Sequence, residues 1–480
     1  MDYIKNIDLN KDLQIETLQD LVSIKSVVSD PVTTREGELF PFGEGVQDAF
    51  ACFLKKAKEL GFETKNIDNY GGHVDFGQGT ETVGILGHLD VVPEGEGWSF
   101  APYSAAVSDG YIYGRGTLDD KGPMVAALYA MKALKDAGYE PAKKVRLIVG
   151  LDEETEWKGM EYYFARQPMP DYGFTPDADF PALNGEKGMM VFEIARKLPK
   201  QSGGLTLRSL SGGSATNMVA EKARAVVNSD SSETYSQIKE LAAAFRTERG
   251  FKVNTKGVGK SLEITVEGKS AHGAYPQAGV NAISVMMEFL GNLNFSSDEL
   301  NVFFDFYRRY IGFDVNGKNL GCGFEDAQSG KLTLNVGLVH YDKGSITLNI
   351  NVRYPVTVTE EQVYEGILPT LNEYDMGLIK VSGKPSVYMA PDSPMIKTLV
   401  GIYQKHTGDT ESKPIVIGGG TYAKAAKNII AFGGIFPGDE DRMHQKDERI
   451  SIDRFMTMTK IYAEAIYQLT QEDFTFTEEE

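Results

Sequence analysis

The stretch "GPMVAALYAMKALKDAGYEPAKKVRLIVGLDEETEWKG", Gly122 to Gly159, carries the main signals for the fold. Its first part predicts a helix over 122–139, because Pro123 stands near the start and Gly138 just past the end. The run "KKVRLIVGL" that follows predicts a buried strand. Upstream, "TVGILGHLDVV" over 82–92 predicts another strand that runs into a loop. This strand, helix and strand indicate an α/β fold with a mostly parallel central sheet flanked by helices.

The pattern changes from about Lys187, where strands such as "LTLRSL", "SLEITVEG" and "KLTLNVGLVHYDKGSITLNINVRYP" alternate with helices. Clusters of strands with helices between them predict an inserted α+β domain. After about Ala390 the helix and strand pattern of the first part resumes, and the last predicted helix covers about 451–469. We therefore expect one α/β domain in two segments, 1–186 and 388–480, with an α+β insertion over 187–387.

Composition and charge exclude several classes of partner. The 480 residues carry a net charge of -19, which argues against binding to nucleic acid or to an anionic membrane. The chain has two cysteines and shows neither an N-terminal signal peptide pattern nor a run of 18 apolar residues. These features predict a cytoplasmic protein without transmembrane helices.

Polar residues with metal-binding chemistry follow the predicted strands. His88 ends one strand, and Asp90 follows in H-x-D spacing, so both side chains fall on one face and the carboxylate could orient a metal-binding imidazole. Alone, this pattern is more often a polar loop. The quoted stretch ends in four crowded carboxylates, Asp152, Glu153, Glu154 and Glu156, which repel one another unless something offsets their charge.

Three further segments add candidates: "GRGTLDDKGP" with Asp119, "FTPDADFP" with Asp177, and "FPGDEDRMHQKDE" with His444. An acidic first helical turn would explain one aspartate of the first segment, and the second segment alone would be a turn. Together, however, the candidates gather at the carboxyl edge of a parallel sheet, where ligands bind in open α/β folds. Two imidazoles and several carboxylates suit zinc, manganese or cobalt, and they exceed what one tetrahedral zinc needs. We therefore predict two metal ions that share a carboxylate.

Six segments resemble, in order, the co-catalytic di-zinc peptidases and deacylases related to aminoacylase-1, carboxypeptidase G and succinyl-diaminopimelate desuccinylase. They are "GHLDVVPEGEGW", "GRGTLDDKGP", "GLDEETEWKGM", "TPDADFP", "GKSAHGAYPQAGVNAI" and "MHQKDE". Within this family, the chain length, the "FTPDADFP" form and the large insertion look most like the bacterial peptidase V-like dipeptidases.

The resemblance implies a role for each residue of the metal site. His88 and Asp177 would bind one zinc ion, Glu154 and His444 the other, and Asp119 both. Asp90 would hold the imidazole of His88, and Glu153 would be the general base. The resemblance also implies a cis peptide bond between Asp119 and Asp120, and it leaves Asp152 and Glu156 solvated or locally hydrogen-bonded.

The inserted domain resembles the family's lid, which supplies substrate contacts. His272 would stabilise the oxyanion, and Asn217 would contact the substrate. Arg353 would bind a terminal carboxylate of the substrate through two parallel hydrogen bonds. Gly420, in "IGGGTYAK", stands in a turn between strand and helix whose amides could hold the same carboxylate. The insertion is long enough for two lid-like halves, whereas many relatives have one and dimerise through it, so we expect a monomer.

The function implied is hydrolysis of unblocked dipeptides by water activated between two zinc ions, with Mn²⁺ or Co²⁺ as possible substitutes. The alternative is an N-acyl amino acid deacylase with the same metal centre. A binding protein without activity would have lost ligands or the base, and none is missing. The sequence leaves open the metal used in the cell, the side chains preferred, and whether β-alanyl dipeptides are accepted.

Overall fold

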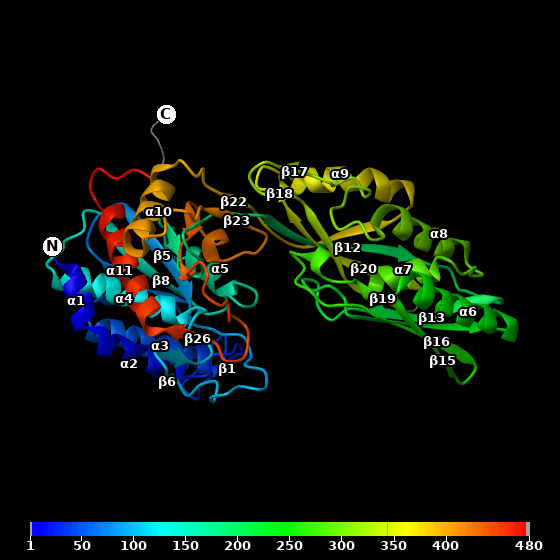
Figure 1. Ribbon diagram of the computed structural model, residues 1–480, viewed down its shortest axis with the longest axis horizontal. Coiled ribbons are helices and arrows are strands. Elements are labelled where there is room, and N and C mark those ends of the chain that lie inside the picture. Colours follow the sequence, from blue (N-terminus) through cyan, green and yellow to red (C-terminus); the bar gives the residue numbers. More distant parts are fainter. Residues whose placement is uncertain (1, 343, 477–480) are drawn as a thin grey trace. The chain divides into compact units, whose positions relative to one another are not determined.

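The computed structural model describes residues 2–342 and 344–476, which form two compact units (Figure 1). Unit 1 contains residues 2–185, 387–416 and 420–476, and unit 2 contains residues 186–386 and 417–419. Residues 1, 343 and 477–480, which fall within the three segments predicted above, lie outside the described residues.

Unit 1 is built on a nine-stranded sheet whose four central strands, β24, β9, β5 and β8, are parallel. The strands beside them run antiparallel. The prediction of a largely parallel central sheet is therefore confirmed. In order, the strands are β22 (Val387–Tyr388), β11 (Leu183–Glu186), β24 (Ile429–Ala431), β9 (Tyr172–Thr175), β5 (Thr82–His88), β8 (Lys144–Gly150), β4 (Gly72–Phe76) and β3 (Glu63–Asn66), with β23 (Ile415–Ile417) beside β11.

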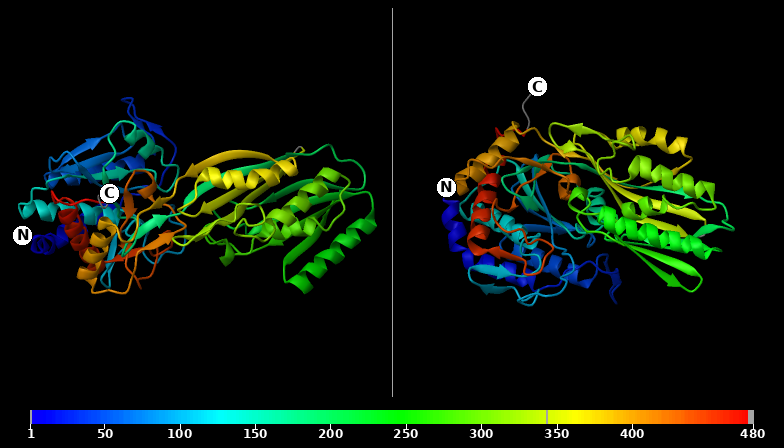
Figure 2. Two further views of the ribbon diagram at one scale, coloured as in Figure 1. Left: turned by 90° about the horizontal axis from the view of Figure 1, so that it is seen from above. Right: turned by 45° about the vertical axis from the view of Figure 1, so that its right-hand side comes forward.

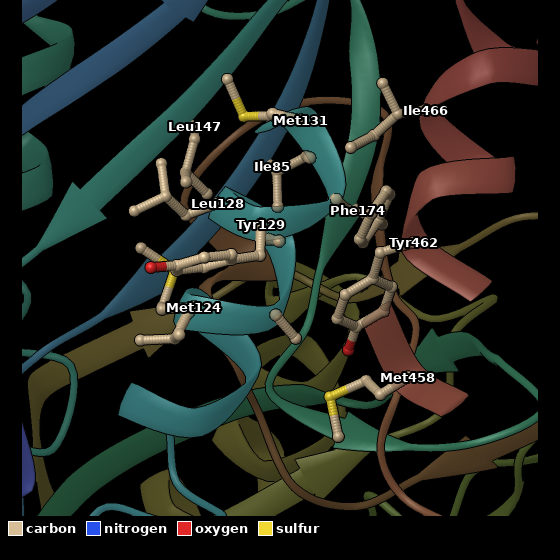
Figure 3. Packing of buried hydrophobic residues seen from close by; sticks show 14 of the residues in the cluster. Ile85, Met124, Leu128, Tyr129, Met131, Leu147, Phe174, Met458, Tyr462 and Ile466 are labelled. Carbon is tan, nitrogen blue, oxygen red and sulfur yellow. The ribbon is translucent and has the colours of Figure 1, made fainter. Parts of the chain in front are cut away.

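Successive residues of the central strands face opposite sides of the sheet, and both sides are covered. In β5, Ile85 belongs to one apolar cluster and Leu86 to another. Figure 3 shows the larger cluster, in which Leu128 of helix α4 (Lys121–Asp136) and Tyr462 of helix α11 (Ile452–Leu469) pack near Ile85 and Phe174. This packing holds α4 against the sheet, so the loop that precedes α4 lies at the carboxyl end of β5.

The other helices of unit 1 contain between 3 and 16 residues. They are α1 (Tyr3–Leu9), α2 (Lys11–Val22), α3 (Glu44–Glu59), α5 (Lys158–Phe164), α10 (Pro394–Thr407) and the 3-10 helix η3 (Tyr422–Lys424). Smaller strands pair outside the main sheet: β1 (Val32–Thr33) with β2 (Leu39–Phe40), β6 (Ala106–Ser108) and β26 (Arg449–Ser451) with β7 (Tyr111–Tyr113), and β10 (Ala178–Asp179) with β25 (Gly434–Ile435). Among the described residues, no helix combines the length and apolar character of a membrane span.

Unit 2 is an eight-stranded antiparallel sheet with helices, as predicted for the α+β insertion (Figure 2). Alternate strand residues, such as Met190, Phe192 and Ile194, enter a single apolar core together with residues of the helices. In order, the strands are β15 (Lys252–Val258), β16 (Ser261–Glu267), β14 (Lys222–Ser229), β13 (Leu205–Gly212), β19 (Thr333–Asp342), β20 (Ser345–Tyr354), β12 (Gly188–Lys197) and β21 (Gly377–Lys384). The helices are α6 (Ser232–Arg249), η1 (Pro276–Ala278), α7 (Ala282–Leu290), α8 (Asp298–Phe306), the π-helix η2 (Tyr307–Ile311) and α9 (Glu360–Glu373), and β17 (Glu325–Asp326) pairs with β18 (Gly330–Lys331).

Candidate metal centre

Strand β5 ends at His88, whose imidazole is fully buried. Its Nδ1 atom lies 3.0 Å from the carbonyl oxygen and 3.3 Å from Oδ1 of Asp90. Its Nε2 atom lies 3.0 Å from Asp119 Oδ1 and 3.6 Å from Asp177 Oδ2. Neither His88 Nε2 nor Asp119 Oδ1 makes a well-directed hydrogen bond within the described residues. Buried polar atoms that face each other in this way suit ligands of a common cation.

Asp119 lies in the loop before α4, and its two carboxylate oxygens face different histidines. Oδ1 faces His88, and Oδ2 lies 2.8 Å from Nε2 of His444. The peptide bond between Asp119 and Asp120 is cis, as the resemblance implies. Asp120 is buried and accepts a hydrogen bond of 3.1 Å from the backbone N–H of His88, which ties the end of β5 to the start of α4. Asp119 therefore has the arrangement of a carboxylate shared between two ions.

The loop after β8 carries Glu153 and Glu154, and Asp90 fixes both of them. The two carboxylate oxygens of Asp90 accept hydrogen bonds from the backbone N–H groups of Glu153 and Glu154, each at 3.1 Å. Glu154 Oε1 in turn lies 2.9 Å from Nε2 of His444. Asp90 therefore does more than orient His88: it joins the carboxyl ends of β5 and β8 at this edge of the sheet.

The two remaining carboxylates of the quoted stretch lie apart from the centre. Asp152 is buried and accepts hydrogen bonds from the backbone N–H of Gly159, at 3.1 Å to each oxygen. Glu156 is exposed and pairs with Lys158. This agrees with the expectation that both are solvated or locally hydrogen-bonded. Asp152 acts here as an internal cap that closes the loop between β8 and α5.

Asp177 and His444 complete the centre from two other parts of unit 1. Asp177 lies two residues after the end of β9 and immediately before β10, which pairs with β25. His444 lies in the loop between β25 and β26, with a positive φ of 59°. Its side chain is about half exposed, at 53%. The sheet therefore brings together residues that are up to 356 positions apart in the chain, His88 and His444.

Two groups of side chains are close enough to bind one metal ion each. In the first group, ligating atoms of His88, Glu153 and Asp177 lie within 4.8 Å of one another, and in the second those of Asp119, Glu154 and His444 do so. Asp119 also approaches His88, so it stands between the groups. Imidazole and carboxylate donors fit borderline divalent ions such as zinc. These residues therefore fit the metal pair that the resemblance implies.

The pKa values show how crowded the negative charge is. Burial, together with the charge of Asp177, raises the pKa of the Glu153 carboxyl well above its ordinary value. Burial and the charge of Asp119 raise the pKa of Glu154 to about 7, although His444 acts against them. Asp119 and Glu154 raise the pKa of the His444 imidazole to about 11. A divalent cation among these carboxylates would relieve the repulsion between them.

Three of the predicted substrate residues belong to unit 2. Asn217 and His272 lie together, because the backbone N–H of Gly273 donates to the Asn217 carbonyl at 2.6 Å and Met218 pairs with His272. Arg353, on β20, is buried, and its Nε donates to Asn351 Oδ1 at 3.1 Å. Its Nη1 has no hydrogen-bond partner among the described residues. This donor is available for an anion.

Gly420 lies in unit 1, after β23 and immediately before Thr421. The sequence predicted a turn from a strand into a helix, and the segment after the turn is the three-residue 3-10 helix η3. Thr421 caps this helix by accepting a hydrogen bond from the backbone N–H of Ala423 at 3.1 Å. The role of Gly420 in carboxylate binding stays a prediction.

Tyr422 and Asn335 support the predicted residues, although the sequence did not indicate a role for either. Tyr422 is fully buried, its ring meets that of His88 edge-on with centroids 6.1 Å apart, and its hydroxyl lies 3.4 Å from Asp152 Oδ1. In unit 2, Asn335 donates through Nδ2 to the carbonyls of Thr216 and Met218, at 3.1 and 2.8 Å, and so holds the segment that carries Asn217. The only sequence signal was the place of Tyr422 in "IGGGTYAK".

Comparison with known proteins gives one family and full-length relatives. Residues 84–468 match Peptidase family M20/M25/M40. The chain is 39% identical to YtjP of Bacillus subtilis, which is provisionally named a dipeptidase, over 95% of this chain and 97% of that protein. It is 35% identical to a Beta-Ala-Xaa dipeptidase of Lactobacillus delbrueckii subsp. lactis, over 97% of this chain and 98% of that protein. The resemblance stated from the motifs is thereby confirmed.

Solved structures share the fold at lower identity. Human carnosine dipeptidase 1 matches with a TM-score of 0.54 and 18% identity, over 97% of each chain. The di-peptidase Dug1p from Saccharomyces cerevisiae matches with a TM-score of 0.56 and 12% identity, over 97% of each chain. At this level of identity, the similarity concerns the arrangement of helices and strands.

Proposed function

Because the chain belongs to Peptidase family M20/M25/M40, we propose that it is a metal-dependent dipeptidase that hydrolyses unblocked dipeptides. The observation that carries this proposal is the shared carboxylate of Asp119, with one oxygen toward His88 and the other toward His444. An arrangement of this kind is suited to two metal ions that act on one substrate. The relatives named as dipeptidases, each matched over nearly its whole length, support the choice of substrate class.

The proposed ligands are His88 and Asp177 for one ion, Glu154 and His444 for the other, and Asp119 for both. We propose two Zn²⁺ ions, with Mn²⁺ or Co²⁺ as substitutes, because all of these accept imidazole and carboxylate donors. When bound, the ions would polarise the scissile carbonyl and make water more acidic.

Glu153 is the proposed general base. Its carboxyl group is close to the ligating atoms of His88 and Asp177. Its backbone N–H donates a hydrogen bond of 3.1 Å to Asp90 Oδ1, which holds the loop in place. Burial raises its pKa well above the ordinary value, which favours a group that takes up a proton and later releases it. Glu153 would remove a proton from the attacking water and then donate it to the nitrogen of the leaving amine.

The residues of unit 2 have proposed roles that come from the family resemblance. Arg353 would bind the terminal carboxylate of the dipeptide, and its buried Nη1, which lacks a partner among the described residues, supports this role. His272 would donate a hydrogen bond to the oxyanion, and Asn217 would contact the substrate. Gly420 of unit 1 would offer a backbone N–H to the carboxylate.

We also propose a monomer, supported by a repeated arrangement within unit 2. In one half of its sheet, the hairpin β13–β14 is followed by α6 and β15, and β16 completes four strands. In the other half, the hairpin β19–β20 is followed by α9 and β21, and β12 completes four strands. The proposed pair of lid-like modules requires two halves of this kind. Light scattering coupled to size-exclusion chromatography tests this proposal, and a mass near twice 52.8 kDa would contradict it.

The proposed location is the cytoplasm, because Cys52 and Cys322 are both free thiols. The test is fractionation of cells that produce the protein, followed by immunodetection. Recovery mainly outside the cytoplasmic fraction would contradict the proposal.

The experiment that tests the activity is a hydrolysis panel. It contains free dipeptides, the same dipeptides with an acetylated amino group, β-alanyl dipeptides and tripeptides, each with and without added Zn²⁺ or Mn²⁺. We expect chelator-sensitive hydrolysis of free dipeptides and little or none of the acetylated or longer peptides. Faster cleavage of the acetylated forms would instead identify an N-acyl amino acid deacylase, and no hydrolysis at all would indicate a binding protein.

A further inference from the structure

Glu448 is a buried carboxylate for which the proposed mechanism has no use, and it contacts the loop that carries Asp119. Its side chain is fully buried. Oε1 accepts hydrogen bonds from the backbone N–H groups of Gly116 at 3.0 Å, Leu118 at 2.8 Å and Asp119 at 3.3 Å. Three backbone donors within residues 116–119, all directed at one oxygen, fix the backbone of this loop up to Asp119 itself.

The other oxygen of Glu448 belongs to a buried ion pair. Oε2 accepts a hydrogen bond of 2.6 Å from Nη1 of Arg115, which is 1% exposed. Arg115 also donates to the carbonyl of Gln445 at 3.3 Å and to the carbonyl of Pro93 at 3.4 Å. Its guanidinium lies over the ring of Trp98, 5.3 Å from the centroid.

The pair therefore joins three segments, each of which lies within five residues of a proposed metal ligand. The carbonyl of Pro93 lies five residues after His88, the N–H donors to Glu448 lead to Asp119, and Gln445 directly follows His444. A change in any one of these segments would move a donor atom relative to the other two. Groups behind the ligands that restrict their movement in this way raise the affinity for metal.

We propose that Glu448, held by Arg115, is a positioning residue of the metal centre, which sets Asp119 between His88 and His444. This inference rests on the proposed metal centre. Glu448 touches neither metal nor substrate in the proposal, and it acts by fixing the backbone of Asp119.

The simpler alternative is that the pair matters only for the fold, because removing one partner of a buried ion pair leaves an unpaired buried charge and so destabilises the protein. Unit 1 contains a suitable control for this alternative. Arg146 of β8 and Asp75 of β4 form a bidentate ion pair, in which Nε and Nη2 of the arginine each donate to one carboxylate oxygen at 2.8 Å. This pair lies on neighbouring strands, and no hydrogen bond within the described residues links the Asp75 carboxylate to a loop that carries a proposed ligand. Asp75→Asn therefore removes an ion pair of the same unit, more exposed than that of Glu448, without touching the centre.

The experiment measures metal affinity and stability separately in Glu448→Gln, Asp75→Asn and the unchanged protein. Each protein is stripped with a chelator, and Zn²⁺ binding is titrated in competition with a chromogenic chelator. We expect the dissociation constant to rise by about 10-fold to 100-fold in Glu448→Gln and to change by less than about 3-fold in Asp75→Asn. The melting temperature of the stripped protein should fall in both variants.

The other possible results distinguish failure of this inference from failure of the proposed metal centre. Unchanged affinity in Glu448→Gln, or an equal loss in Asp75→Asn, overturns the inference while leaving the proposed function intact. If Glu448→Gln does not fold, Arg115→Lys replaces it, because the lysine keeps a cation beside Glu448 but cannot reach Gln445 and Pro93 together. An affinity in Arg115→Lys equal to that of the unchanged protein then overturns the inference. Failure of the unchanged protein to bind two ions overturns the proposed metal centre itself.

Discussion

Glu153 can be tested as a base against the alternative that it is a metal ligand, because its carboxylate lies within 4.8 Å of the ligating atoms of His88 and Asp177. Glu153→Gln keeps the size of the side chain and removes its ability to take up a proton. We expect kcat to fall by about 10²-fold to 10⁴-fold, with two ions still bound. Kinetics and metal analysis of the same samples check this. Loss of one ion from the variant would make Glu153 a ligand, and unchanged kcat would remove it from the mechanism.

His73 gives the protein a dependence of stability on pH that is separate from the metal centre. Its ring is buried beside Tyr163, whose hydroxyl lies 2.7 Å from Nδ1. Burial, with the charge of Arg146, lowers the pKa of His73 from 6.5 to about 4. Between these values the unfolded chain binds more protons at this histidine than the folded protein does. The free energy of unfolding is therefore at its full value above pH 6.5 and decreases as the pH falls toward 4. We expect this histidine to account for roughly 2 to 3 kcal/mol of the loss.

The measurement is urea unfolding between pH 7 and pH 4.5 in the presence of a chelator, so that metal release does not contribute. The matched variant is His73→Asn, whose Oδ1 can still accept the hydrogen bond from Tyr163 but does not titrate. The variant should lose less stability over this range than the unchanged protein does. An identical dependence on pH would show that His73 is not responsible.

At the scale of the element, strand β5 approaches helix α4 so closely that only glycine fits at position 87. A Cβ atom there would lie 2.2 Å from Asp120 Oδ2 and 2.5 Å from Met124 Sδ. Gly87→Ala should therefore lower the free energy of unfolding by about 1 to 3 kcal/mol. It should also weaken metal binding, because Asp120 Oδ2 holds the backbone of His88.

The control is a helical glycine with free space around it. Gly401 lies in α10, and a Cβ atom there would meet nothing within 4 Å. Gly401→Ala should raise the free energy of unfolding by about 0.5 to 1 kcal/mol through helix propensity alone. Urea unfolding measures both variants. Gly87→Ala with unchanged stability would mean that β5 and α4 can move apart without cost.

At the scale of the whole molecule, the two units have separate apolar cores. The clusters around Ile85 and Leu86 belong to unit 1, and the cluster around Phe192 belongs to unit 2. All proposed metal ligands belong to unit 1. Since a ligand stabilises only the folded part that binds it, we expect two calorimetric transitions, of which the chelator shifts one to lower temperature. A single transition, or an equal shift of both, would contradict this prediction.

Much of this protein follows from local sequence patterns. Apolar runs such as that over 144–150, which end in polar residues, predicted the strands and the edge at which the ligands gather. Pro123 and Gly138 marked a helix that the structure places at Lys121–Asp136. Six motifs in order identified the family. These features depend on neighbours in the chain, so periodicity and residue type are enough to predict them.

Only the tertiary structure decided which groups meet. Asp90 accepts hydrogen bonds from Glu153 and Glu154, more than 60 residues away, and Glu448 accepts one from Leu118 across 330 residues. Spacing in the sequence cannot predict such contacts, because they depend on how α4, the central strands and the loop of His444 pack together. The sequence by itself predicted which residue types form the centre. The sharing of Asp119 between two histidines, the burial of Asp152 and the place of Glu448 behind the ligands arise from packing between distant segments.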